Sequence, residues 1–162
     1  MLELKTDRQD SADYEADMVL WFERQITLLR QHRFTELDLE NLIEELESIV
    51  KHERRALESR LEVLLMHLLK CEFQPERMSK SWLRALYEQR RRIERKLKDS
   101  PSLVPTLAEV AEEAYPHAVQ LAAIETGLAP AVFPAANPYT LAQLRDAGFV
   151  PNGPAVSPPS AS

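Results

Sequence analysis

The segment LDLENLIEELESIVKHERRALESRLEVLLMHLLKCEF, residues 37–73, decides the fold class. It contains no glycine or proline, and its apolar residues recur every three or four positions, which places them on one side of an α-helix. With Asp38 as N-cap and Phe73 at its end, this helix would be about 50 Å long at 1.5 Å per residue, a length that allows a bend or a division. The stripe consists of Leu39, Leu42, Leu46, Ile49, Val50, Leu57, Leu61, Leu64, Leu65 and Leu68.

The segments on either side also have helical patterns. We expect one helix from about Ser11 to His32, another that is capped by Ser79 or Ser81 and runs to about Lys98, and a further one that begins at Ser100 or Ser102 and ends at Gly127. Pro116 lies inside the last of these and predicts a kink or a break, because proline removes a backbone hydrogen bond. The stripe expected on the first helix consists of Tyr14, Met18, Phe22, Gln25 and Leu29, flanked by Trp21 and Ile26.

The composition changes after Gly127, since seven of the 11 prolines occur from Pro130 onward. This predicts an extended strap and a short helix from Tyr139 to Asp146 that dock on the bundle through Phe133, Leu141, Leu144 and Phe149. The fold class is therefore all-α: an antiparallel bundle of about four main helices with a Pro-rich C-terminal strap and a short terminal helix. We expect a flexible N-terminus (1–10), one domain (11–150, with the bundle at 11–127 and the strap at 128–150) and a disordered tail (151–162).

The size and composition of the chain favour a soluble cytoplasmic protein. Its 162 residues suffice for one domain, and its single cysteine, Cys71, cannot form an internal disulfide. The first ten residues do not resemble a secretion signal. The longest apolar stretch, Val63 to Leu69, is far shorter than the roughly 20 residues that cross a bilayer.

Several segments resemble successive signatures of one bacterial family, the domain of unknown function 29. They are LDLENLIEELESI, RLEVLLMHLLKCEFQPERMSKSW, EQRRRI, DSPSL and FPAANPYTLAQL. The resemblance covers roughly Tyr14 to Pro151 and implies an all-helical protein with no established activity, so it supplies no catalytic residue. Two positions depart from the pattern: Cys71 stands where an aromatic residue is expected, and Asn137 stands where cysteine is expected.

Charge is strongly segregated along the chain, whose net charge is −6. Residues 36–62 contain nine acids and four bases, whereas residues 77–98 contain nine bases and two acids. The short link between these consecutive helices makes them expected antiparallel neighbours. We therefore expect Glu53, Glu58 and Glu62 to face Arg90, Arg84 or Lys80 of the next helix.

Most of the basic residues of 79–98 fall on the side opposite its apolar stripe. This predicted interaction surface consists of Lys80, Arg84, Arg91, Arg95 and Lys98. We expect it to bind a protein partner, alternatively another copy of the chain. Nucleic acid is the competing partner, but the acidic net charge and the lack of aromatic residues among these bases argue against it. We expect no membrane partner.

Other polar residues border the apolar stripes. Glu53, Arg60, Gln89 and Arg90 predict a half-buried network that fixes the helix register, with a Glu53–Arg90 contact as one of its pairs; a ligand site between the helices is the alternative. His67 and Cys71 share one helical face and are weak candidates for a metal site, because a structural zinc needs two further ligands.

The sequence contains no catalytic motif, and we expect no cofactor. The hypothesis is a non-enzymatic helical module for protein interaction or regulation that presents segregated acidic and basic faces. A nucleic-acid-binding protein is the first alternative, and a bundle that binds a metal or a small ligand is the second.

Overall fold

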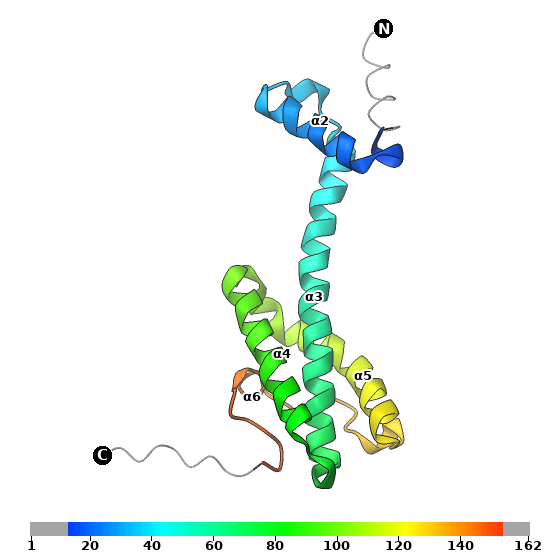
Figure 1. Cartoon of the computed structure of the whole chain (residues 1–162), viewed down its shortest axis with the longest axis vertical. Coiled ribbons are helices and arrows are strands. Elements are labelled where there is room, and N and C mark those ends of the chain that lie inside the picture. Colours follow the sequence, from blue (N-terminus) through cyan, green and yellow to red (C-terminus); the bar gives the residue numbers. More distant parts are fainter. Residues whose placement is uncertain (1–12, 154–162) are drawn as a thin grey trace, which may run out of the picture. The chain divides into compact units, whose positions relative to one another are not determined.

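A computed structural model describes residues 13–153 and shows an all-α protein, with no strand in that range (Figure 1). The chain divides into two compact units, the first ending at His52 and the second beginning at Glu53. The helix α3 (Leu39–Phe73) contributes to both units and is a single helix of 35 residues. Its continuity agrees with the absence of glycine and proline. The predicted flexible N-terminus and residues 154–162 of the predicted tail lie outside the described residues.

The first helix of the first unit is shorter than predicted. Residues 13–16 form one helical turn, and α2 (Met18–Arg30) begins only after Asp17. Asp17 has φ −149° and accepts a hydrogen bond from the backbone N–H of Leu20 at 3.0 Å, so it is the N-cap of α2. The expected single helix from about Ser11 to His32 is therefore wrong in its continuity, because it is interrupted at Asp17, and it ends at Arg30; Ser11 itself lies outside the described residues.

Asp38 organises the small core of the first unit. Its carboxylate accepts a hydrogen bond from Trp21 Nε1 at 3.0 Å, and its backbone N–H donates to Gln25 Oε1 at 2.9 Å. The same side chain accepts from the N–H of Asn41 at 3.4 Å, as expected of a residue that caps α3. The turn η1 (Phe34–Glu36) joins α2 to this cap.

The buried face of α2 differs from the predicted stripe. Leu28 is buried, whereas Leu29, which the sequence placed in the stripe, is 43% exposed. Trp21 is fully buried and was expected only to flank the stripe. The predicted face was wrong because α2 has apolar residues on two sides, and helical periodicity does not say which side packs inward.

The second unit is built around the C-terminal half of α3. The helix α4 (Lys80–Asp99) runs antiparallel to α3, since Lys70 lies against Trp82 and Glu53 against Lys96. The helix α5 (Leu107–Thr126) runs parallel to α3. Figure 1 shows these two helices on either side of α3. In chain order the remaining elements are η2 (Pro75–Arg77), α4 (Lys80–Asp99), η3 (Pro101–Thr106), α5 (Leu107–Thr126), η4 (Pro130–Val132) and α6 (Leu141–Arg145).

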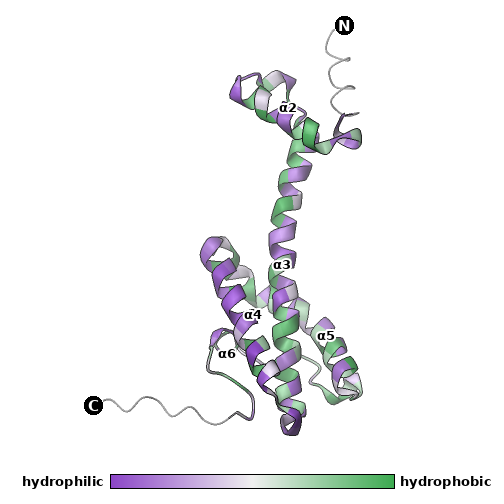
Figure 2. Ribbon diagram, in the orientation of Figure 1, coloured by the Kyte–Doolittle hydropathy of each residue, from purple (hydrophilic) through white to green (hydrophobic). Residues whose placement is uncertain are grey.

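The core lies where α3, α4, α5 and the strap meet, and Figure 2 shows apolar and polar residues interleaved along the helices, as amphipathic packing requires. The predicted α3 stripe is buried in this half, but Leu39, Leu46, Ile49 and Val50 of the other half are exposed, so that part of the expectation is wrong. Core residues include Leu57, Leu61, Leu64, Leu65 and Leu68 of α3, Leu86, Ile93 and Leu97 of α4, and Leu107, Val110, Ala114, Ala118 and Ala122 of α5.

Of the predicted kink or break at Pro116, the structure rules out the break. The helix is continuous from Leu107 to Thr126, and its residues on both sides of Pro116 are buried in the core. Packing of this kind offsets the hydrogen bond that proline removes. Gly127, with φ +74°, ends the helix as predicted.

The strap is docked on the second unit. Phe133 is buried and lies edge-on against Phe73, and Tyr115 donates its hydroxyl hydrogen to the carbonyl of Pro134 at 2.7 Å. The predicted short helix exists as α6, with Thr140 as N-cap. The strap continues into the predicted tail, where Asn152 Nδ2 donates to the carbonyl of Glu72 at 3.0 Å.

Candidate functional site

The outer face of α4 places all five predicted surface cations in solvent. Ser79 caps the helix, and Leu86, Ile93 and Leu97 anchor its opposite side in the core. Arg91 contacts Glu88 at 3.2 Å and Arg95 lies 3.9 Å from Asp99. Among the described residues, no ion pair involves Lys80, Arg84 or Lys98. We call this set the α4 basic face; it consists of Lys80, Arg84, Arg91, Arg95 and Lys98, all exposed.

An aromatic side chain accompanies these cations. Tyr87 is 57% exposed and lies three residues after Arg84 and four before Arg91, so it shares their helical face. Leu83 is exposed beside it. The sequence-based argument that no aromatic residue stands among the bases is therefore wrong.

A polar pocket of about 330 Å³ lies near the C-terminal end of α4. Within it Lys96 Nζ donates to the Glu53 carboxylate at 2.6 Å, which joins α4 to α3. Four of its six lining residues are cationic, so it extends the positive charge of the α4 basic face. The lining residues are Glu53, Arg60, Arg92, Arg95, Lys96 and Asp99.

The structure divides the predicted polar network. Glu53 and Arg60 share the pocket, but Arg90 does not contact Glu53 and instead lies on the strap. Gln89 is half-buried, and its Oε1 has no hydrogen-bond partner among the described residues. Glu62 faces His117 of α5 at 3.0 Å, and Glu53 pairs with Lys96 of α4, so the partners predicted for these two acids are wrong.

Arg90 fixes the strap to α4. Its Nε, Nη1 and Nη2 atoms donate to the backbone carbonyls of Leu144, Phe149 and Gln143 at 3.0, 2.8 and 3.0 Å. The side chain is only 2% exposed, and burial lowers the pKa of its guanidinium. Two of the three carbonyls belong to α6, so the cation lies at the negative end of that short helix.

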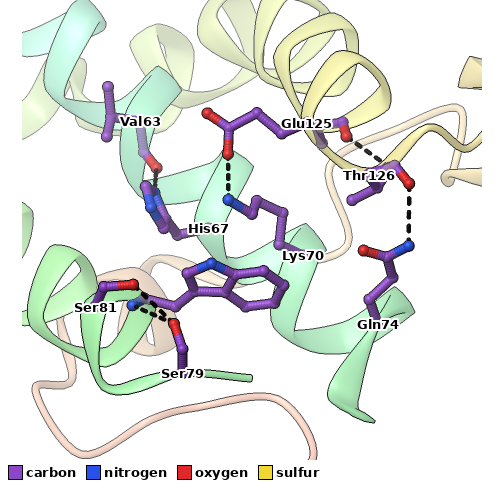
Figure 3. A network of polar contacts seen from close by, with 10 residues as sticks. Val63, His67, Lys70, Gln74, Ser79, Ser81, Glu125 and Thr126 are labelled. Carbon is purple, nitrogen blue, oxygen red and sulfur yellow. Dashed lines mark hydrogen bonds and ion pairs between the residues drawn. The ribbon is translucent and has the colours of Figure 1, made fainter. Parts of the chain in front are cut away.

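A second polar network joins α3, α4 and α5 (Figure 3). Lys70 is 5% exposed; its Nζ donates to Glu125 of α5 and lies 4.4 Å from the ring centroid of Trp82. Gln74 donates to the carbonyl of Thr126 at 3.1 Å, one turn further along. The carboxylate and the aromatic ring together compensate the buried ammonium, so this network is a structural clamp.

The weak metal candidates have other partners. His67 Nδ1 lies 2.9 Å from the carbonyl of Val63, and burial lowers the pKa of its imidazole. Burial also raises the pKa of the Cys71 thiol, which opposes formation of the thiolate that binds metals or attacks substrates. Residues 13–153 contain no group of three or more His, Cys, Asp or Glu side chains arranged to hold a metal ion.

The sequence matches one family model over most of its length. The family described as Domain of unknown function DUF29 matches residues 14–150. The chain belongs to this family. No curated protein and no solved structure matches the chain. In this DUF29 protein no helix of the described part is long and apolar enough to span a membrane.

Sequence reasoning missed two residues that hold this DUF29 protein together. Lys70 lies among the leucines of α3, and its partner Glu125 is 55 positions away. Tyr139 donates its hydroxyl hydrogen to Glu72, and burial raises the pKa of that phenol. The signal for Lys70 was a charge inside an apolar stripe, the same signal that singled out Arg90.

Proposed function

We propose that this DUF29 protein is a non-enzymatic interaction module whose α4 basic face binds an acidic protein partner. The observation that supports the proposal is the exposure of five cations on one helical face, three of which have no carboxylate partner in the described part of the chain. Solvated surface pairs contribute only about 0–1 kcal/mol each, so such a face adds little to stability. Its charge would instead attract and orient a partner of opposite charge.

The surplus of positive charge on α4 remains after internal pairing. Lys96 reaches Glu53, and Arg90 is committed to the strap, while Glu94 is bound by Arg145 of α6 at 2.7 Å. Contacts with other elements therefore engage two of the eight bases and one of the three acids of α4. The cations that face outward are left to solvent or to a second molecule.

Charge reversal of the α4 basic face tests the proposal. The variant carries Lys80, Arg84, Arg91 and Arg95 changed to Glu, and the control carries Lys51→Glu and Arg55→Glu, two exposed bases outside α4. Affinity capture from a bacterial lysate with mass spectrometry should recover an acidic protein with wild type and control but not with the reversed variant. The association rate of the purified pair should fall as salt rises. Equal capture by all three proteins would contradict the proposal.

Binding of single-stranded nucleic acid is a second candidate, which the exposed Tyr87 between Arg84 and Arg91 favours. Bases stack on exposed aromatic rings while cations contact the phosphates. Fluorescence polarisation with a labelled single strand tests it: five phosphate contacts give a log–log salt slope of about −3.5. Tyr87→Ala should weaken this binding and leave capture of an acidic protein unchanged.

A further inference from the structure

The first unit carries most of the exposed apolar side chains of the protein. Of the 17 large hydrophobic residues exposed in the described part of the chain, 11 precede His52, although this unit is the smaller one. Of the 25 buried hydrophobic residues, only Trp21 and Leu28 lie in the first unit. The described part of this unit, residues 13–52, therefore buries little apolar surface of its own, and small units with small cores are often stabilised by oligomerisation.

Eight of these 11 exposed residues form one stripe on each of α2 and α3, and Leu20, Phe34 and Ile49 lie outside the stripes. Successive helical residues are separated by about 100°, which places the stripe of α2 within an arc of about 100° beside its buried face, and the stripe of α3 within about 60°. Trp21 and Gln25 are on the buried face of α2, and Leu42 and Glu45 are on the less exposed side of α3. The α2 stripe consists of Met18, Val19, Ile26 and Leu29, and the α3 stripe of Leu39, Ile43, Leu46 and Val50, with exposed fractions of 43–69%.

A helix that is apolar on two sides is normally enclosed by further helices. Taking roughly 150 Å² for a fully exposed side chain, near the lower bound for aromatic residues, eight half-exposed side chains present on the order of 600 Å². A standard interface buries about 800 Å² per partner, of which somewhat more than half is apolar. The two stripes therefore match one complete protein interface.

We propose that the first unit forms a twofold dimer in which the α2 stripe of one copy packs against the α3 stripe of the other. Charge selects this pairing over α3 against α3, since residues 39–50 contain four acids and no base, whereas α2 contains one acid, Glu23, and two bases, Arg24 and Arg30. The contact is isologous and closes with two copies. It involves no residue of the α4 basic face and is independent of the proposed function.

The segments outside the described residues contain too little apolar surface to cover these stripes. Residues 1–12 include three large apolar residues, Met1, Leu2 and Leu4, and residues 154–162 include one, Val156. Eight side chains are to be covered. A second copy of α2 and α3 supplies the same number of apolar residues in the same spacing.

Sedimentation equilibrium of the full chain tests the dimer. Wild type should sediment with twice the mass of the chain, and high salt should not dissociate it, because apolar contacts are not screened. Leu46→Glu should raise the dissociation constant at least about tenfold. The matched control Leu83→Glu changes an exposed leucine of α4 and should leave the dissociation constant unchanged, as should the four-residue reversal of the α4 basic face. A monomeric wild type, or equal dissociation by the control, would overturn the proposal.

Disulfide trapping tests the pairing without relying on a disruptive variant. One copy carries a cysteine in the α2 stripe, such as Ile26→Cys, and the other carries one in the α3 stripe, such as Val50→Cys, while the native Cys71 is buried. A scan of such mixtures should give mixed disulfides, because cross-linking requires Cα atoms within about 7 Å. Leu83→Cys should cross-link with neither. Exclusive trapping of α3 with α3 would overturn the proposed arrangement.

Discussion

Replacing Arg90 with methionine should detach the strap from α4. The substitution keeps the unbranched stem but removes three charged donors whose acceptors are the carbonyls of Gln143, Leu144 and Phe149. A hydrogen bond to a charged group contributes roughly 1.5–3 kcal/mol, and part of this loss is recovered when the strap moves and water reaches the carbonyls. We therefore expect destabilisation of about 3–5 kcal/mol, which is less than the sum of three such hydrogen bonds because of this partial recovery.

The assay is urea unfolding followed by circular dichroism, together with amide hydrogen exchange. In a chain of this size, a loss of about 3–5 kcal/mol corresponds to a melting temperature lower by roughly 6–20 °C. Exchange should accelerate first at residues 141–150, because the lost bonds hold that segment. Arg90→Lys should have an intermediate effect, since one ammonium cannot reach three carbonyls in a fixed fork.

The neighbouring Arg91 supplies the control. It is exposed, and its one ion pair within residues 13–153 is with Glu88, so Arg91→Met should change stability by less than about 0.5 kcal/mol. Equal effects of the two substitutions, or unchanged exchange at residues 141–150 in Arg90→Met, would refute the role assigned to Arg90.

Three further changes have definite expected outcomes. Burial lowers the folded-state pKa of His67, so just below pH 6.5 only the unfolded chain gains a proton at this residue. The free energy of unfolding should therefore fall on acidification by at most about 1.4 kcal/mol per pH unit. Urea midpoints should depend less on pH in His67→Gln, whereas the exposed control His52→Gln should keep the pH dependence of the wild type. Pro116→Ala should stabilise by about 1–2 kcal/mol in thermal melts, because it restores a hydrogen bond and Pro116 is exposed; destabilisation would show that the ring is needed. Cys71 should react with a thiol reagent only after urea unfolds the second unit, and rapid labelling of the native protein would contradict its burial.

The helices of the second unit were predictable because each has a local signal. Ser79 caps α4, Gly127 ends α5, and the apolar spacing identifies the inner faces. The position of Pro116 inside a helix predicted a possible break, but α5 is continuous because core packing on both sides of the proline stabilises the helix. A local rule states the cost of a residue but not what the surrounding core contributes to offset it.

The partners of the buried charges were not predictable. Arg90 was recognised as a charge beside an apolar stripe, and a carboxylate such as Glu53 was its expected partner. The structure supplies three backbone carbonyls instead. Carbonyls are present at every residue, so the sequence carries no mark of which ones are left free by a short helix such as α6.

The apolar stripe of α3 is a further case in which the sequence indicates which residues tend to be buried but not which surface covers them. Its spacing continues without change from Leu39 to Leu68, yet only the half after Leu57 is buried in the described structure. Around that half, α4, α5 and the strap supply the opposing surface. Before His52 the same pattern has no such cover, although an uninterrupted stripe signals burial equally in both halves. The proposed dimer would make the two halves of α3 consistent, because a second copy would give the exposed half an apolar partner that the described part of the unit does not supply.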